Sequence, residues 1–207
     1  MSTTTITTHY GYDIILPDGV TAVPDLVTPN DIALASNGRI SPNDSRLTGV
    51  CSAVSAAIRD YCRWHVAPSL SCVCQTEVLT RIITLPAKLV TSIDEVEVEG
   101  DTLDSALYEW KRAGLLRLRK WPHHRGRWGA YTISYQAGLD PSASPLAQVA
   151  TQVALNNLIA TPGVRNESVG QVSLSYSQPT EGVSGGVQLL DRDKDLLRSY
   201  RVQTKVR

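Results

Sequence analysis

Apolar residues recur every three or four positions in four stretches of this chain, which is the spacing of an amphipathic helix. The stretches are residues 29–36, 42–65, 145–160 and 187–200. Each of the first three begins with proline directly after serine or threonine, a pair that favours the first turn of a helix. The pattern therefore predicts four helices.

Between residues 76 and 138 the spacing of apolar residues changes from three or four to two, which is typical of strands. Residues 96–99 alternate valine with glutamate, and Tyr131, Ile133 and Tyr135 alternate in the last strand. Glycines at 100 and 114 favour hairpin turns. This segment predicts five or six antiparallel strands, and the fold class expected is α+β: a small bundle of about four helices with an antiparallel β insertion between the second and third helices.

The chain then divides into parts with different expected structure. We expect an extended N-terminal arm (1–27), a helical core (28–75 and 139–163), the β insertion (76–138), a flexible loop with a short strand (164–186), and a C-terminal helix with a basic tail (187–207).

Composition and net charge argue against several classes of protein. The chain has 207 residues, 42% of them apolar, and a formal net charge of zero, which does not favour a general nucleic-acid binder. The N-terminus lacks the pattern of a secretory signal, and no apolar run is long enough to span a membrane. We expect a protein made in the cytoplasm, with no membrane contact.

Four cysteines and one histidine lie close together in the sequence, namely Cys51, Cys62, Cys72, Cys74 and His65. A zinc site is one interpretation, but the Cys-x-Cys spacing is tighter than in structural zinc sites. Small buried core residues are the preferred interpretation of these cysteines, and no metal is expected.

Charge is segregated within the β insertion. Seven acidic residues occur without an intervening Lys or Arg, and they are followed by seven basic residues. The acidic residues are Asp94, Glu95, Glu97, Glu99, Asp101, Asp104 and Glu109; the basic ones are Lys111, Arg112, Arg117, Arg119, Lys120, Arg125 and Arg127.

Three interpretations of this segregation stay open. Acidic and basic strands of one hairpin pair within the chain. Alternatively, the acidic edge of one subunit meets the basic edge of the next, or the basic residues line a channel for DNA. The candidate residues for a subunit interface or DNA channel are Glu95, Glu97, Glu99, Arg117, Arg119, Lys120, Arg125 and Arg127.

A nucleic-acid-binding module is the alternative function. Within residues 110–128, three tryptophans and two histidines alternate with basic residues, a composition suited to base stacking and phosphate contact. No catalytic motif occurs: the sequence has no phosphate-binding loop, nucleophile elbow or His-Glu-x-x-His. We therefore expect neither an enzyme nor a cofactor.

Several segments, in their order, resemble the head-tail connector (head-completion adaptor) proteins of long-tailed bacteriophages. They are the short helix at 29–36, ISPNDSRL, AAIRDYCRWHVAPS, the β insertion ending in YTISYQAG, the helix at 145–160, VRNESVGQVSLSYS and GVQLLDRDKDLLRSYR. The similarity covers about residues 25–202.

This resemblance implies a structural virion protein in the neck between capsid and tail. Copies of the chain, about twelve in a dodecamer, are expected to form an oligomeric ring with cyclic symmetry. The implied partners are the portal protein above the ring, the next neck or tail-completion protein below it, and DNA that passes through the lumen without sequence specificity. The implied portal-docking residues are Leu189, Leu190, Leu196, Leu197, Tyr200, Arg201, Lys205 and Arg207. The same leucines also suit packing inside the chain itself.

Overall fold

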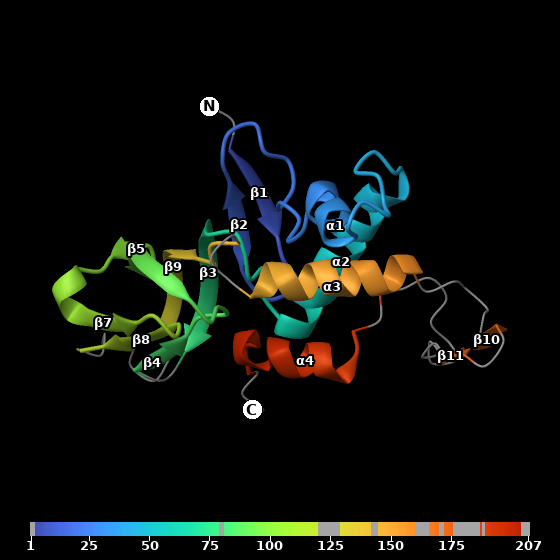
Figure 1. Cartoon of the computed structure of the whole chain (residues 1–207). Coiled ribbons are helices and arrows are strands. Elements are labelled where there is room, and N and C mark those ends of the chain that lie inside the picture. The colour runs from blue at the N-terminus through green and yellow to red at the C-terminus, as the bar shows by residue number, and fades with distance from the viewer. Residues whose placement is uncertain are drawn as a thin grey trace. The chain divides into compact units, whose positions relative to one another are not determined.

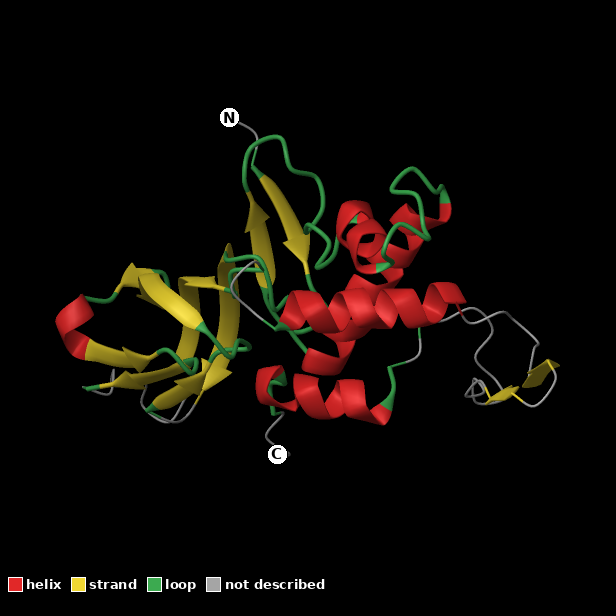
Figure 2. Cartoon of the chain, in the orientation of Figure 1, coloured by secondary structure: helices red, strands yellow, loops and turns green. Residues whose placement is uncertain are grey.

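The structure is a computed structural model that describes residues 3–78, 81–119, 129–141, 145–159, 166–169, 172–175, 187 and 189–203. The chain divides into two compact units. The β unit comprises Met1–Pro24, Cys62–Ser144 and Arg198–Arg207, and the helical unit comprises Asp25–Tyr61 and Pro145–Leu197. Figure 1 labels their elements, and Figure 2 separates helices from strands by colour.

The β unit is built on a six-stranded antiparallel sheet with the strand order β1-β2-β3-β9-β5-β6. Its strands are β1 (Thr4–Thr7), β2 (Asp13–Leu16), β3 (Leu70–Val78), β5 (Val90–Val98), β6 (Asp101–Thr102) and β9 (Gly129–Ala137). A second sheet has the order β4-β8-β7, with β4 (Ile82–Thr84), β7 (Tyr108–Lys111) and β8 (Leu115–Leu118). The 3-10 helix η1 (Ser105–Leu107) precedes β7, and η2 (Arg198–Tyr200) lies near the C-terminal end.

The two sheets of the β unit form two layers (Figure 1), and both sheets bury apolar side chains. Alternate residues of β9 are buried, and their register partners on β3 and β5 point to the same face. Alternate residues of the small sheet are buried in the same way. The buried residues of the two sheets are Cys72, Cys74, Val96, Val98, Tyr131, Ile133, Tyr135, Ile83, Leu116 and Leu118.

The helical unit contains α1 (Pro29–Ala35), α2 (Arg46–Cys62, whose last residue belongs to the β unit), α3 (Leu146–Ile159) and α4 (Asp191–Leu197). It also contains a two-stranded sheet of β10 (Asn166–Val169) and β11 (Val172–Ser175). Helix α1 begins with a capping box: the backbone N–H of Asp31 donates to the Thr28 hydroxyl, and the Thr28 N–H donates to the Asp31 carboxylate.

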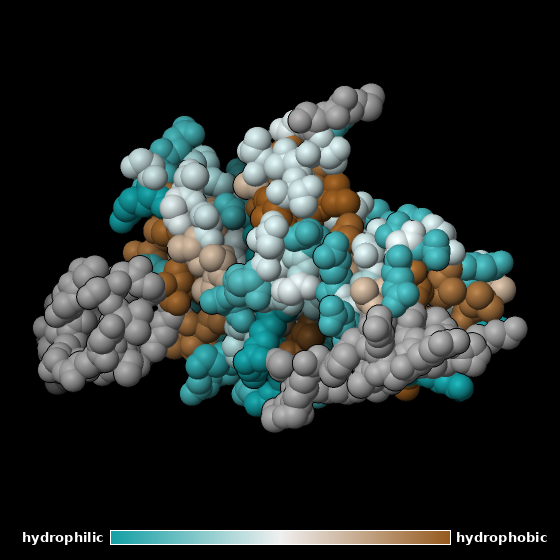
Figure 3. Space-filling model, turned by 180° about the vertical axis from the view of Figure 1, so that it is seen from behind, coloured by the Kyte–Doolittle hydropathy of each residue, from teal (hydrophilic) through white to brown (hydrophobic). Residues whose placement is uncertain are grey.

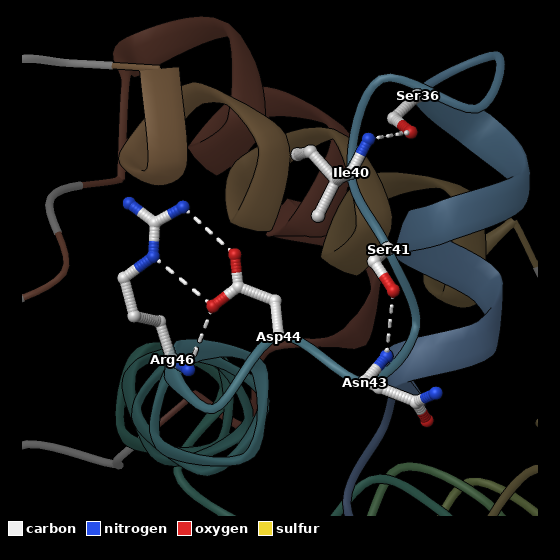
Figure 4. Close-up of polar contacts among 6 residues, drawn as sticks. All are labelled: Ser36, Ile40, Ser41, Asn43, Asp44 and Arg46. Atoms are coloured by element: carbon white, nitrogen blue, oxygen red, sulfur yellow. Dashed lines mark hydrogen bonds and ion pairs between the residues drawn. The ribbon is translucent and has the colours of Figure 1, made fainter.

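Helix α2 begins later than its sequence pattern predicts. Asp44 accepts from the backbone N–H of Arg46 at 3.0 Å and pairs with the Arg46 guanidinium at 2.8 Å (Figure 4). Hydrogen bonds from Arg46 lower the pKa of the Asp44 carboxyl to about 2. The helix ends at Cys62 and not at His65, because Arg63 adopts a φ of 64° that a helix cannot accommodate.

The expected fold, a small helical bundle with a β insertion, is wrong. The chain is a sheet-rich mixed α/β protein with a six-stranded antiparallel sheet, a three-stranded sheet and four helices among the described residues. The main reason is that residues expected to form a loose N-terminal arm supply β1 and β2, and β2 pairs with β3. Strand β3 itself begins at Leu70 and includes Cys72 and Cys74. None of the helices in the described ranges is long and apolar enough to cross a membrane.

Candidate interaction surfaces

The cysteine side chains that were candidates for a zinc site lie in the core. All four cysteines are buried free thiols. Burial raises the pKa of Cys62 and of Cys72 to about 12, and that of Cys74 to about 11. These thiols are protonated and shielded at neutral pH, so they are poor nucleophiles. Within the described ranges, no group of three or more His, Cys, Asp or Glu side chains is arranged to hold a metal ion.

His65 is part of a buried hydrogen-bond network in the β unit. Its Nε2 lies 2.9 Å from the carbonyl oxygen of Ala137, and its Nδ1 lies 2.9 Å from the Tyr12 hydroxyl. The backbone N–H of His65 donates to the same hydroxyl at 2.9 Å. Because a carbonyl only accepts, Nε2 carries a proton, and in the neutral ring Nδ1 accepts from Tyr12. The imidazole therefore joins the turn after α2 to Tyr12, the residue before β2, and to the end of β9.

The six-stranded sheet carries acidic residues and no Lys or Arg in any of its strands. Its acidic residues are Asp13, Glu77, Asp94, Glu95, Glu97 and Asp101. None of these six carboxylates forms an ion pair with another residue in the part of the chain that the structure describes.

Register places some of these acids together on one outward face. Glu95 lies opposite Ser134 and Glu97 opposite Thr132, while the neighbouring Val96 and Val98 point into the core. On the other side of β9, Gln75 lies opposite Thr132 and Glu77 opposite Ala130. We call the outward surface made by Gln75, Glu77, Glu95, Glu97, Thr132 and Ser134 the acidic face. A shallow depression of about 350 Å³ beside it is lined by Gln75, Thr76, Glu77, Ala130, Tyr131 and Thr132.

The three-stranded sheet has the opposite charge. Arg117 lies opposite Ile82 on β4 and opposite Glu109 on β7, and Lys111 lies opposite Leu115. Arg119 follows β8, and its guanidinium is 3.9 Å from the Glu109 carboxylate. We call the outward surface made by Ile82, Glu109, Lys111, Leu115, Arg117 and Arg119 the basic face.

The basic face also exposes apolar side chains. Ile82 is 50% exposed and Leu115 is 38% exposed, although both belong to strands whose alternate residues are buried. Apolar surface of this unit is visible in brown at the right of Figure 3. Residues 120–128 follow directly in the chain and lie outside the described residues, so the predicted interface residues Lys120, Arg125 and Arg127 have no described position.

Intrachain pairing explains part of the charge segregation. The guanidinium of Arg117 lies 3.1 Å from the Glu109 carboxylate across β7 and β8. Glu95 instead accepts a hydrogen bond from the Thr102 hydroxyl at 2.8 Å, and Glu99 is exposed in the turn between β5 and β6. The structure thus brings Arg117 and Arg119 to one acid, Glu109, while Glu95 and Glu97 lie on the other sheet.

The C-terminal segment that was predicted to dock on a portal is anchored at several points. In the helical unit, the Tyr61 hydroxyl donates to the carbonyl of Lys194 at 3.0 Å, and the buried Asp193 caps the backbone N–H of Leu190 at 3.1 Å. In the β unit, the indole N–H of Trp64 donates to the carbonyl of Tyr200 at 2.7 Å. The N–H of Val202 donates to the carbonyl of Cys62 at 2.9 Å.

The predicted docking residues differ widely in exposure. Leu197 is fully buried, whereas Leu196 is 61% exposed. Leu189, Leu190, Tyr200 and Arg201 are half-buried, and Lys205 and Arg207 lie outside the described residues. Among the described residues of this set, Leu196 therefore offers the largest apolar surface to a partner.

Sequence reasoning missed Glu77 as a member of the acidic face, because it lies outside the acidic stretch. One signal was available in the sequence: no Lys or Arg occurs in residues 1–38 or between Arg63 and Arg81, the segments that supply β1, β2 and β3. No protein-family model matches the chain, and no curated protein matches it.

Proposed function

We propose that this protein is a structural virion component, a head-to-tail adaptor whose copies form a ring beneath the portal. DNA passes through the lumen of the ring, and the chain is neither an enzyme nor a carrier of a cofactor. The proposal places the protein in the neck of a phage particle, after synthesis in the host cytoplasm.

The observation that carries this proposal is the division of charge between the two sheets of the β unit. Outward acidic residues lie on one sheet and outward basic residues on the other. A molecule with two different complementary faces favours head-to-tail contact, and such contacts close into rings when the rotation per subunit permits. The order of sequence segments, which is similar to that of head-tail connector proteins, adds the position under a portal.

The proposed portal contact involves the exposed side of α4. Leu196 is a large apolar residue that the chain leaves exposed next to the fully buried Leu197. A partner that covers Leu196 gains apolar burial without disturbing the residues that anchor this segment.

Incubation of the purified protein with isolated portal rings, followed by electron microscopy, tests the proposal. We expect an additional collar on the portal, and we expect Leu196→Asp to weaken its formation. Leu34→Asp is the matched control, because Leu34 is a leucine on another helix with a similar exposure of 70%. Portal rings that acquire no collar from the wild-type protein contradict the proposal.

Nucleic-acid binding is the second candidate, favoured by the exposed Lys111, Arg117 and Arg119 on one sheet face. This function predicts tight binding of free DNA by the isolated chain, with an affinity that falls steeply as salt increases. The adaptor proposal predicts weak affinity for free DNA. A filter-binding titration at two salt concentrations separates the two functions.

A further inference from the structure

We propose that the basic face of one copy docks on the acidic face of the next copy, and that this contact is the subunit interface of the assembly. The inference deepens the proposed ring and rests on it for the closure of the assembly, but the contact itself is testable with the purified chain alone.

Charge complementarity is the first reason to expect that a second copy of the chain covers these faces. Between Arg81 and Leu89 and between Ser105 and Arg119, Glu109 is the only acidic residue, whereas both segments are rich in Lys and Arg. The strands that form the acidic face contain no Lys or Arg at all. The same chain therefore presents both halves of a complementary pair of surfaces, which suits a heterologous contact between identical subunits.

The second support is the mixture of side chains on the basic face. Ile82 and Leu115 are exposed beside Arg117 and Lys111. A face that binds only the phosphates of DNA has no need of exposed isoleucine and leucine, whereas protein interfaces bury apolar residues inside a polar rim. The acidic face offers hydroxyl and amide groups from Thr132, Ser134 and Gln75 that can accept or donate at such a rim.

The depression beside the acidic face is suited to an arginine. Glu77 provides a carboxylate, and Gln75 and Thr132 line the depression beside it. A guanidinium can form two parallel hydrogen bonds with a carboxylate, which a lysine cannot reproduce. Arg119 is the stronger candidate to enter it, because its distance of 3.9 Å to Glu109 marks a weaker intrachain pair than the 3.1 Å of Arg117.

Paired charge reversals test this contact. The variant Lys111→Glu/Arg119→Glu makes the basic face acidic and leaves the Glu109–Arg117 pair in place. The variant Glu77→Arg/Glu97→Arg makes the acidic face basic and replaces the carboxylate that is proposed to receive Arg119. Arg39→Glu is the control, because Arg39 is an exposed arginine of the helical unit, outside both faces.

Sedimentation velocity at low salt measures self-association of the full-length chain over a range of concentrations. We expect the wild-type protein and Arg39→Glu to associate. We expect each double variant alone to raise the dissociation constant at least about tenfold, because like charges then meet across the contact. An equimolar mixture of the two double variants is expected to recover association, since each reversed face then meets its complement.

The mixture also controls for folding, because variants that fail to fold do not recover association. A wild-type chain that stays monomeric at its highest soluble concentration overturns the inference. A mixture that fails to associate although both variants keep wild-type circular dichroism spectra also overturns it. If Lys111→Glu/Arg119→Glu loses DNA binding but associates normally, the basic face is a nucleic-acid surface and the inference is wrong. Self-association without collar formation on portal rings supports this contact and contradicts the proposed function.

Discussion

Removal of one hydroxyl group, in Tyr12→Phe, tests the buried network around His65. Tyr12 is 4% exposed and His65 is 1% exposed. The Tyr12 hydroxyl accepts from the backbone N–H of His65 and donates to Nδ1 of the same residue, both at 2.9 Å. The substitution removes this partner from two polar groups that water does not reach.

The expected cost follows from the number of groups affected. Each buried polar group that loses its hydrogen bond costs about 1–3 kcal/mol, so the two groups together set a range of about 2–6 kcal/mol. Small rearrangements in the network reduce this cost, and we expect Tyr12→Phe to lower the free energy of unfolding by about 2–4 kcal/mol.

Tyr135→Phe is the matched control, because it removes the same hydroxyl from another buried tyrosine of the β unit. Tyr135 is fully buried, and its hydroxyl has no hydrogen-bond partner among the residues that the structure describes. Burial raises the pKa of this hydroxyl far above its usual value. Removing a buried polar atom that makes no hydrogen bond is expected to leave stability unchanged or to raise it by up to about 1 kcal/mol.

Urea denaturation at neutral pH, followed by tryptophan fluorescence, measures both variants. Trp64 is a suitable probe because the centroid of its ring lies 5.4 Å from that of His65. Equal effects of the two substitutions, or a larger loss from Tyr135→Phe, refute the assignment of hydrogen bonds given above.

Three further predictions concern the backbone, the thiols and the C-terminal helix. Gly138 has a φ of 131°, and a Cβ atom there would lie 2.2 Å from the carbonyl oxygen of Pro68, so Gly138→Ala is expected to cost more than about 3 kcal/mol in urea denaturation. Gly100→Ala, at a φ of 92° with nothing within 4 Å, is expected to cost only about 1–2 kcal/mol, and similar losses for both contradict this geometry. Burial raises the pKa of Cys74 to about 11 and that of Cys72 to about 12, above the ordinary value of 9.0. The stability that depends on these thiols being protonated is therefore complete below pH 9 and declines as pH rises toward 11–12. Urea denaturation at pH 8 and pH 10 measures this decline, which Cys72→Ala is expected to reduce; a decline of the same size in that variant excludes Cys72 as its source. Leu197→Ala is expected to cost about 2–5 kcal/mol because Leu197 is fully buried, whereas Leu196→Ala is expected to change stability by less than about 0.5 kcal/mol, as thermal melts of both variants will show.

Local signals in the sequence predict that the four helices exist, although α2 and α4 are shorter than predicted, and they do not predict how the sheets are assembled. Thr28, Pro29 and Asp31 form the start of α1 through contacts within four residues, so the sequence alone predicts it. The four residues of β1 and of β2 are too short for a distinctive alternation. Their pairing depends on β3, in which Cys72 lies opposite Ile14, and a partner so distant in the sequence leaves no local trace.

The same limit applies to the candidate surfaces. The segregation of charge between residues 94 and 127 is visible in the sequence, but which acids share a face is a matter of strand register. Glu77 joins Glu95 and Glu97 only because β3 and β5 both pair with β9. Conversely, Glu109 belongs to the acidic stretch in sequence but to the basic face in space.

The ion pairs that Glu109 forms within the chain are not sufficient to explain the segregation of acidic and basic residues. The side chains of Arg117 and Glu109 are 65% and 47% exposed, so their pair contributes no more than about 1 kcal/mol. One such acid does not neutralise Lys111, Arg117 and Arg119 together, and the carboxylates of the other sheet form no ion pair among the described residues. Each sheet therefore retains repulsion between like charges, which interspersed charges would avoid. In the proposed contact, the oppositely charged face of a second copy relieves both repulsions at once, and this is the physical argument for an intersubunit role of these charges.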